Sequence, residues 1–190
     1  MDSTNFEARL LDRAKQGDAQ AVGRLYDSLF PGVYGFACMR LPTIQDAEDI
    51  VSETFLTMVK KLPGFEPAHS GAFRAWVFRI ARNKITDFYR ANGNRRVIET
   101  DELVLAATAS GTDVQAKVQR DELRFSLLAS IGELQPRQQE VILLRYFGGL
   151  RNKDIAEVLA IEERTVSAHL SRGLKSLQGV IQNEWIQEAS

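Results

Sequence analysis

Apolar residues recur three or four positions apart through most of this 190-residue sequence, and this spacing places them along one side of an α-helix. The pattern is clear over residues 6–29, 47–62 and 166–177, and glycine or proline separates one helical segment from the next. The first half shows no alternation of strand and helix patterns. We therefore expect an all-α protein.

The segment from Phe73 to Arg96, FRAWVFRIARNKITDFYRANGNRR, is the most unusual of these helices. One side is apolar and aromatic, and the opposite side carries Arg79, Arg82 and Asn83. Seven Lys and Arg side chains are offset by one acidic residue here, although the formal net charge of the whole chain is only -1. Such a concentration of positive charge is typical of a surface that binds a phosphate backbone. A solvated basic helix over an aromatic core would have the same composition, so this segment alone leaves both interpretations open.

The composition changes after this helix. Residues 97–117 are acidic, rich in small residues and without aromatic side chains. We interpret residues 93–118 as a linker between an N-terminal domain, 1–92, and a C-terminal domain, 119–190. The expected architecture is therefore two small helical domains joined by a linker.

The helix expected over residues 46–62 carries an acidic stripe. Asp46, Asp49 and Glu53 lie on its outer side, next to Leu56. The helix dipole explains acidic residues near a helix N-terminus, but Glu53 lies too far along the helix for that explanation. The stripe is either a docking surface for a basic partner or a solvated helix face.

The end of the chain predicts a helix-turn-helix. Residues 150–159 form a short helix, residues 160–162 a tight turn and residues 164–177 a longer helix. These are the elements of a DNA-binding helix-turn-helix, although an ordinary helical hairpin would share them. The outward residues of the longer helix, which would face the major groove, are Arg164, Ala168, Ser171, Arg172 and Lys175.

Several other classes of protein are disfavoured. Cys38 has no second cysteine to pair with, and His69 and His169 are too few for a metal-ligand cluster, so we expect no metal and no cofactor. The absence of a glycine-rich phosphate loop and of a nucleophile with its base argues against an enzyme. The N-terminus does not resemble a signal peptide and no apolar run is long enough to span a bilayer, so we expect a cytoplasmic protein.

The near-zero net charge bears on how the chain would bind DNA. Freestanding DNA-binding proteins usually carry a clear excess of Lys and Arg, which release counterions from the duplex. We therefore expect weak DNA binding by the chain alone and tight binding when a larger partner holds it. The alternative is a free transcriptional regulator that uses only the terminal helix-turn-helix, and tight promoter binding without a partner would favour it.

Four blocks of the sequence together resemble one protein family. They are GDAQAVGRLYDSLFPGVYGFA, DAEDIVSETFLTMVKKLPGF, FRAWVFRIARNKITDFYR and LQPRQQEVILLRYFGGLRNKDIAEVLAIEERTVSAHLSRGLKSL. In order and spacing they resemble the two domains of extracytoplasmic-function (ECF) sigma factors, a class of bacterial transcription initiation factors. The resemblance covers nearly the whole chain. It implies an alternative sigma factor that binds core RNA polymerase, directs it to specific promoters and is held inactive by an anti-sigma factor.

The resemblance also implies a role for each candidate surface. The residues that it implies for core polymerase binding are Asp46, Asp49, Glu53 and Leu56, and residues 138–147 would help to meet the polymerase flap. Those for the melted non-template strand of the minus-ten element are Phe65, His69, Trp76, Arg79, Arg82, Asn83 and Arg90. Those for the duplex minus-thirty-five element are Arg164, Thr165, Ser167, Ala168, Ser171, Arg172 and Lys175.

Three residues depart from the pattern of the family. Val59 stands where tryptophan is common, and we expect this change to repack the domain without touching the interface. Ala160 stands at a turn where glycine is usual, so a left-handed backbone there would cost about 1 kcal/mol. Glu162 replaces a small capping residue, which weakens the predicted start of the last helix.

Overall fold

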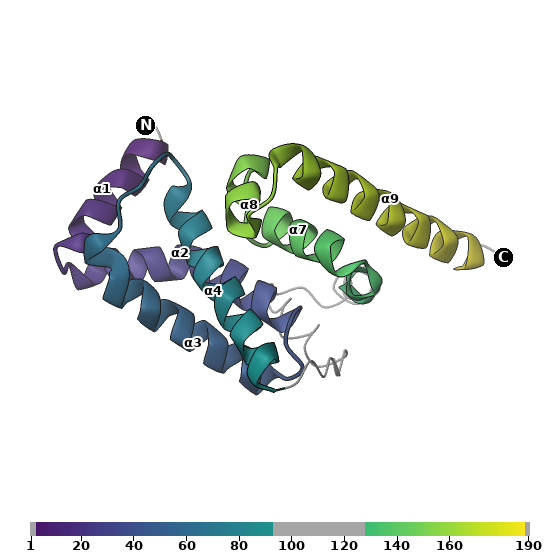
Figure 1. Cartoon of the computed structure of the whole chain (residues 1–190), viewed down its shortest axis with the longest axis horizontal. Coiled ribbons are helices and arrows are strands. Elements are labelled where there is room, and N and C mark those ends of the chain that lie inside the picture. The colour runs from purple at the N-terminus through teal and green to yellow at the C-terminus, as the bar shows by residue number, and fades with distance from the viewer. Residues whose placement is uncertain (1–2, 93–127, 189–190) are drawn as a thin grey trace.

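The computed structural model describes residues 3–92 and 128–188, and these residues form helices and no strand. This result confirms the expected all-α fold. The predicted linker, 93–118, and the predicted start of the second domain lie outside the described residues. Figure 1 shows the two groups of helices side by side. The elements are α1 (Ser3–Lys15), α2 (Ala19–Cys38), α3 (Ile44–Lys61), a 3-10 turn η1 (Leu62–Gly64), α4 (Ala72–Ala91), α7 (Pro136–Tyr146), α8 (Asn152–Leu159) and α9 (Glu163–Glu188).

Side-chain caps fix the starts of α2 and α3. The carboxylate of Asp18 accepts hydrogen bonds from the backbone N–H groups of Gln20, at 2.9 Å, and Ala21, at 3.1 Å. The bond from Ala21 and a hydrogen bond from Arg13 lower the pKa of Asp18. Thr43 caps α3 in the same way, by accepting from the N–H of Asp46. These caps satisfy N–H groups that have no partner inside the helix.

The core of the first group lies where α2, α3 and α4 pack together. Phe36 of α2 and Phe78 of α4 are fully buried, and their rings meet edge to face with centroids 5.7 Å apart. Each of these helices buries one apolar face against its neighbours. This burial explains why the amphipathic pattern of the sequence predicted the helices. Cys38 is buried in the same core, and burial raises its pKa to about 11.

The second group is a helix-turn-helix supported by α7. Ala160 ends α8 with a left-handed backbone, φ 53° and ψ 49°, which is the conformation expected to be costly for alanine at this turn. The helix α9 then crosses α7 closely, since a Cβ at Gly173 would lie 2.6 Å from the side chain of Ile142. Val166 and Leu177 are buried at this crossing, whereas Leu174 is 39% exposed.

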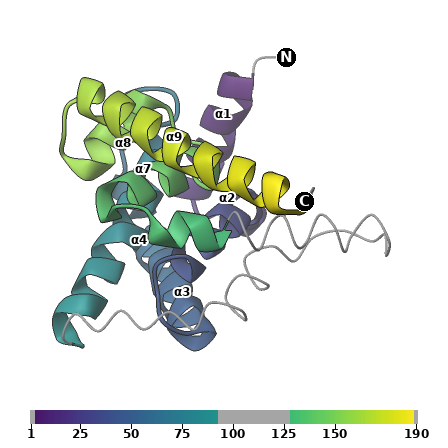
Figure 2. The same ribbon diagram turned by 90° about the vertical axis from the view of Figure 1, so that its right-hand side faces the viewer.

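The two groups of helices touch along α4, which packs against α8 (Figures 1 and 2). Phe147, directly after α7, also packs against α2. It lies against Gly32 and Gly35, and a Cβ on either glycine would overlap Phe147. The lack of side chains at these two positions therefore lets the second group approach the first.

Candidate interfaces for protein and nucleic acid

The acidic stripe of α3 presents its four predicted residues in different ways. Asp49 is exposed, and Leu56 is 60% exposed. Glu53 is exposed as well, but its carboxylate accepts a hydrogen bond of 2.8 Å from Lys84 of α4. Asp46 is partly buried and accepts a hydrogen bond of 2.7 Å from the hydroxyl of Thr43, so part of its role is to start the helix.

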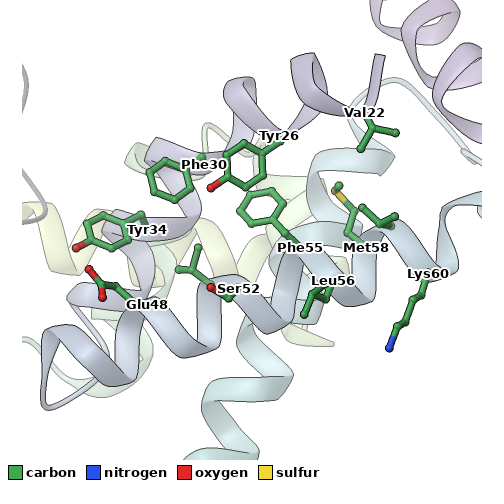
Figure 3. Close-up of a pocket in the computed structure, with 12 residues that line it drawn as sticks. Val22, Tyr26, Phe30, Tyr34, Glu48, Ser52, Phe55, Leu56, Met58 and Lys60 are labelled. Carbon is green, nitrogen blue, oxygen red and sulfur yellow. The ribbon is translucent and has the colours of Figure 1, made fainter. Parts of the chain in front are cut away.

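An apolar groove runs beside this stripe, between α2 and α3 (Figure 3). Its volume is about 770 Å³. Tyr26, Phe30 and Tyr34 line one wall in a row, and neighbouring ring centroids are 5.2 Å and 5.5 Å apart. Phe55 of α3 meets Tyr26 with centroids 4.5 Å apart, and Leu56 belongs to both the groove and the stripe.

The groove was not expected from the sequence. Val22, Tyr26, Phe30 and Tyr34 follow one another at intervals of four residues, which places them on one face of α2. That spacing was a usable signal, but aromatic residues at helical spacing more often indicate a core face. Val59, which we expected to affect the packing inside the domain, is 45% exposed and lines the groove. That expectation was wrong, because the side chain belongs to the surface.

The groove has a polar end. Figure 3 shows the hydroxyl of Tyr34 pointing toward the carboxylate of Glu48. Burial, the neighbouring Cys38 and the negative charge of Glu48 raise the pKa of Tyr34 to about 12. The side chain of Tyr34 is also hydrogen-bonded to that of Cys38.

An aromatic cluster joins the loop before α4 to the start of that helix. The ring of Phe65 stacks on Trp76, with centroids 4.6 Å apart and an angle of 29° between the planes. Phe73 closes the cluster, with its centroid 5.8 Å from that of Trp76. Phe65 and Trp76 are partly exposed. The structure therefore brings together two of the residues predicted to bind a melted strand.

The other residues predicted for strand binding form two sets. Asn83 and Arg90 are exposed, and Arg90 pairs with Asp87 on the same helix at 2.9 Å. Arg79, Arg82 and His69 instead contact residues of the second group of helices. These contacts were not expected from the sequence, because they join residues that lie far apart in the chain.

The outward face of α9 carries the residues predicted to read duplex DNA. Arg164, Ser167, Ser171, Arg172 and Lys175 are exposed, and Thr165 and Ala168 are partly exposed. Arg164 pairs with Glu162 in the turn before the helix. The hydroxyl of Ser167 donates to the carbonyl of Glu163 at 3.1 Å and accepts from the side-chain amide of Asn152, also at 3.1 Å.

His169 lies on the inner side of α9 and is not part of the outward face. Burial, together with the nearby charges of Arg172 and Arg137, lowers its pKa. Across residues 3–92 and 128–188 no group of three or more His, Cys, Asp or Glu side chains could hold a metal ion. No helix in the same part of the chain is long and apolar enough to cross a membrane.

Comparisons with known proteins match both groups of helices. Residues 25–95 match sigma-70 region 2 and residues 124–177 match sigma-70 region 4. The ECF sigma factor BldN of Streptomyces coelicolor is 31% identical over 176 residues, which are 92% of this chain and 66% of BldN. The ECF sigma-E factor of Haemophilus influenzae is 27% identical over 183 residues, which are 91% of this chain and 94% of that protein.

One solved structure with a similar fold contains the protein CnrH in complex with the cytosolic domain of CnrY. The likeness has a TM-score of 0.65 at 25% identity and covers 92% of this chain and 96% of the CnrH chain. The fold similarity therefore extends over both groups of helices.

Proposed function

The chain belongs to the extracytoplasmic-function sigma factors, and from this membership we propose how its surfaces divide the work of initiating transcription. The chain binds core RNA polymerase, directs it to specific promoters and initiates transcription there. The observation that carries the proposal is the presence of three chemically distinct surfaces in one chain. They are an acidic and apolar surface on α3, a cationic and aromatic surface on α4, and the outward face of α9.

We assign polymerase binding to the stripe of α3 together with the groove beside it. Asp49 offers negative charge to a basic partner, and Leu56 connects that charge to the aromatic wall of the groove. Charge complementarity fixes the orientation of a complex, and buried aromatic residues commonly supply most of its binding energy. The other two acidic residues of the stripe, Asp46 and Glu53, belong to the same surface.

We assign the melted non-template strand of the minus-ten element to α4 and the loop before it. Phe65 and Trp76 provide aromatic surface on which bases can stack, and the cations of α4 lie along the same helix. Strand opening loses stacking of about 1.4 kcal/mol per base-pair step. Contacts with the unpaired bases offset this cost only after the strands have separated.

We assign the duplex minus-thirty-five element to α9. The side chains on its outward face are small or cationic, so the helix can enter the major groove. Arg172 is the residue that we expect to make a two-pronged contact with a guanine.

Sigma factors are regulatory DNA-binding proteins, and we propose that this chain contributes recognition while the polymerase carries out the chemistry. The place of action is then the cytoplasm, where the polymerase works. We also propose an anti-sigma factor as a partner. The complex of CnrH with the cytosolic domain of CnrY supports a protein partner of this kind.

The proposal is tested by transcription with purified core polymerase on a library of genomic fragments. We expect transcripts that begin at a limited set of start sites and that disappear when the chain is left out. Uniform initiation, with or without the chain, would contradict the proposed function.

The polymerase surface is tested by reversing the charge of Asp49. We expect Asp49→Arg to weaken binding to core polymerase by a factor of ten or more, about 1.4 kcal/mol, because it places a cation against a basic partner. The matched control is Asp12→Arg, which makes the same change at an exposed site on α1. Equal binding by both variants in a pull-down with core polymerase would remove α3 from the interface.

A further inference from the structure

Part of the cationic face of α4 is already occupied by acidic residues of the second group of helices. Glu140 of α7 is a buried carboxylate with a side chain only 8% exposed. It accepts a hydrogen bond of 2.9 Å from Arg82 of α4 and pairs with Arg40, just after α2, at 3.3 Å. Arg137, on the same helix as Glu140, pairs with it at 2.8 Å. Glu140 therefore links the first group of helices to the second through charges that are poorly exposed to water.

Glu157 of α8 occupies two more of the predicted strand-binding residues. Its backbone carbonyl accepts a hydrogen bond of 3.1 Å from Arg79, and its carboxylate lies 3.0 Å from the Nε2 atom of His69. Arg151 donates to the backbone carbonyl of Ser70 next to His69. The loop before α4 and the middle of α4 are thus both held by α8 and the residue before it.

The fit between the groups also depends on shape. Phe147 fills a notch on α2 that exists because positions 32 and 35 are glycines. A side chain at Gly35 would overlap the ring of Phe147, and one at Gly32 would overlap its backbone. A close helix approach of this kind requires small residues, and the resulting contact does not depend on charge.

We infer that the free chain closes on itself through Glu140, Glu157 and Phe147, and that this closure keeps Arg79, Arg82 and His69 from the melted strand until a partner separates the two groups of helices. The inference rests on the proposed function of α4. The contacts of Glu140, Glu157 and Phe147 would restrain strand binding by α4 in the free chain.

The closed arrangement blocks only one of the three surfaces. The outward face of α9 and the groove between α2 and α3 remain exposed. A polymerase can therefore reach the closed chain and shift it toward the open state, provided that it binds the open state more tightly. Strand-binding residues would then be released only where the polymerase is present.

The closure is tested first by the distance between two spin labels in the full chain. Gln45→Cys on α3 and Gln178→Cys on α9 place the labels at exposed sites, and Cys38→Ala removes the native thiol. Phe147→Ala combined with Glu157→Gln removes contacts from the second group of helices, and Gly35→Leu fills the notch from the first. The control is Glu133→Gln, at an exposed site away from these contacts.

We expect one narrow distance distribution for the unmodified contacts and for the control, and a broader, longer distribution for both opening variants. Circular dichroism confirms that each variant keeps its helices. If the unmodified contacts already gave the broad distribution, or if neither opening variant changed the narrow one, the inferred closure would be refuted.

The masking is tested by binding of a fluorescein-labelled single strand of about 20 nucleotides and mixed sequence. If about nine molecules in ten are closed, opening should tighten binding about tenfold. Unchanged affinity in a variant that the labels show to be open would overturn the masking. The proposed function is tested apart from it, since transcription with core polymerase should be similar for the unmodified chain and for Gly35→Leu, whose substituted residue lies outside the groove and the three DNA- and polymerase-binding surfaces.

Discussion

At the scale of single residues, Ala160 keeps a backbone conformation that suits glycine. Its φ of 53° and ψ of 49° let the chain turn between α8 and α9, and it is the only described residue other than glycine with a positive φ. A Cβ in this region lies too close to the neighbouring carbonyl oxygen. The helix-turn-helix therefore forms with local strain at its turn.

Replacing this residue should relieve the strain. We expect Ala160→Gly to raise the free energy of unfolding of the second group of helices by about 1 kcal/mol, measured by urea denaturation. Gly149→Ala is the matched comparison, and we expect it to lower the free energy of unfolding. Gly149 has φ 62°, and an added Cβ would meet nothing within 4 Å, so only the backbone conformation opposes the substitution. If Ala160→Gly destabilised the protein as much as Gly149→Ala, the backbone explanation would be wrong.

At the scale of helices, the sequence was informative about faces and uninformative about partners. The side of α4 that was predicted to be apolar and aromatic includes Phe73 and Val77, and both side chains are buried. Periodicity predicted Arg79 and Arg82 on the wet side, but not their contacts with α8 and α7. A hydrophobic pattern depends on one helix alone, whereas an ion pair depends on how distant segments pack.

The groove and α9 also show that a sequence pattern does not tell which residues a neighbouring helix covers. Aromatic residues at intervals of four could line a core or a surface groove, and only the packing of α2 against α3 distinguished the two. In α9, Leu174 stands three residues before the buried Leu177, yet its own side chain is 39% exposed. The roles assigned to individual DNA-contacting residues stay predictions.

The assignment of α9 leads to a prediction about Arg172. We expect Arg172→Ala to weaken binding of the holoenzyme to the minus-thirty-five element by about 1–3 kcal/mol, the contribution of one two-pronged base contact. Arg24→Ala, at an exposed site on α2, is the control. Footprints that stay unchanged at the upstream element would remove Arg172 from the recognition surface.

At the scale of the whole molecule, one titratable group lies in the contact between the two groups of helices. His69 has its Nδ1 atom 3.0 Å from the carbonyl of Ser70 and its Nε2 atom 3.0 Å from the carboxylate of Glu157. Both partners are acceptors, so both bonds form together only when the imidazole is charged. These two bonds raise the pKa of His69. The charged groups facing it from α8 are Asp154, Glu157 and Lys153, and Arg151 precedes that helix.

The sign of the pH effect follows from the raised pKa. The contribution of His69 to closure is complete below its usual pKa of about 6.5 and is lost as the pH rises through the raised value. We expect the closed fraction, measured with the same spin labels, to fall as the pH rises from about 6 to about 8. His69→Gln should remove this dependence, whereas a dependence that survives the substitution would assign it to another group.

The pair of glycines on α2 has a consequence for how this chain can change over time. The notch for Phe147 exists because Gly32 and Gly35 have no side chains. We therefore expect a single nucleotide substitution that replaces either glycine with a larger residue to keep the two groups of helices apart. Such a mutant would retain every side chain assigned to DNA binding and would lose only the closed arrangement. Retention of the closed state over evolution therefore depends on two glycines that are not among the residues assigned to DNA binding.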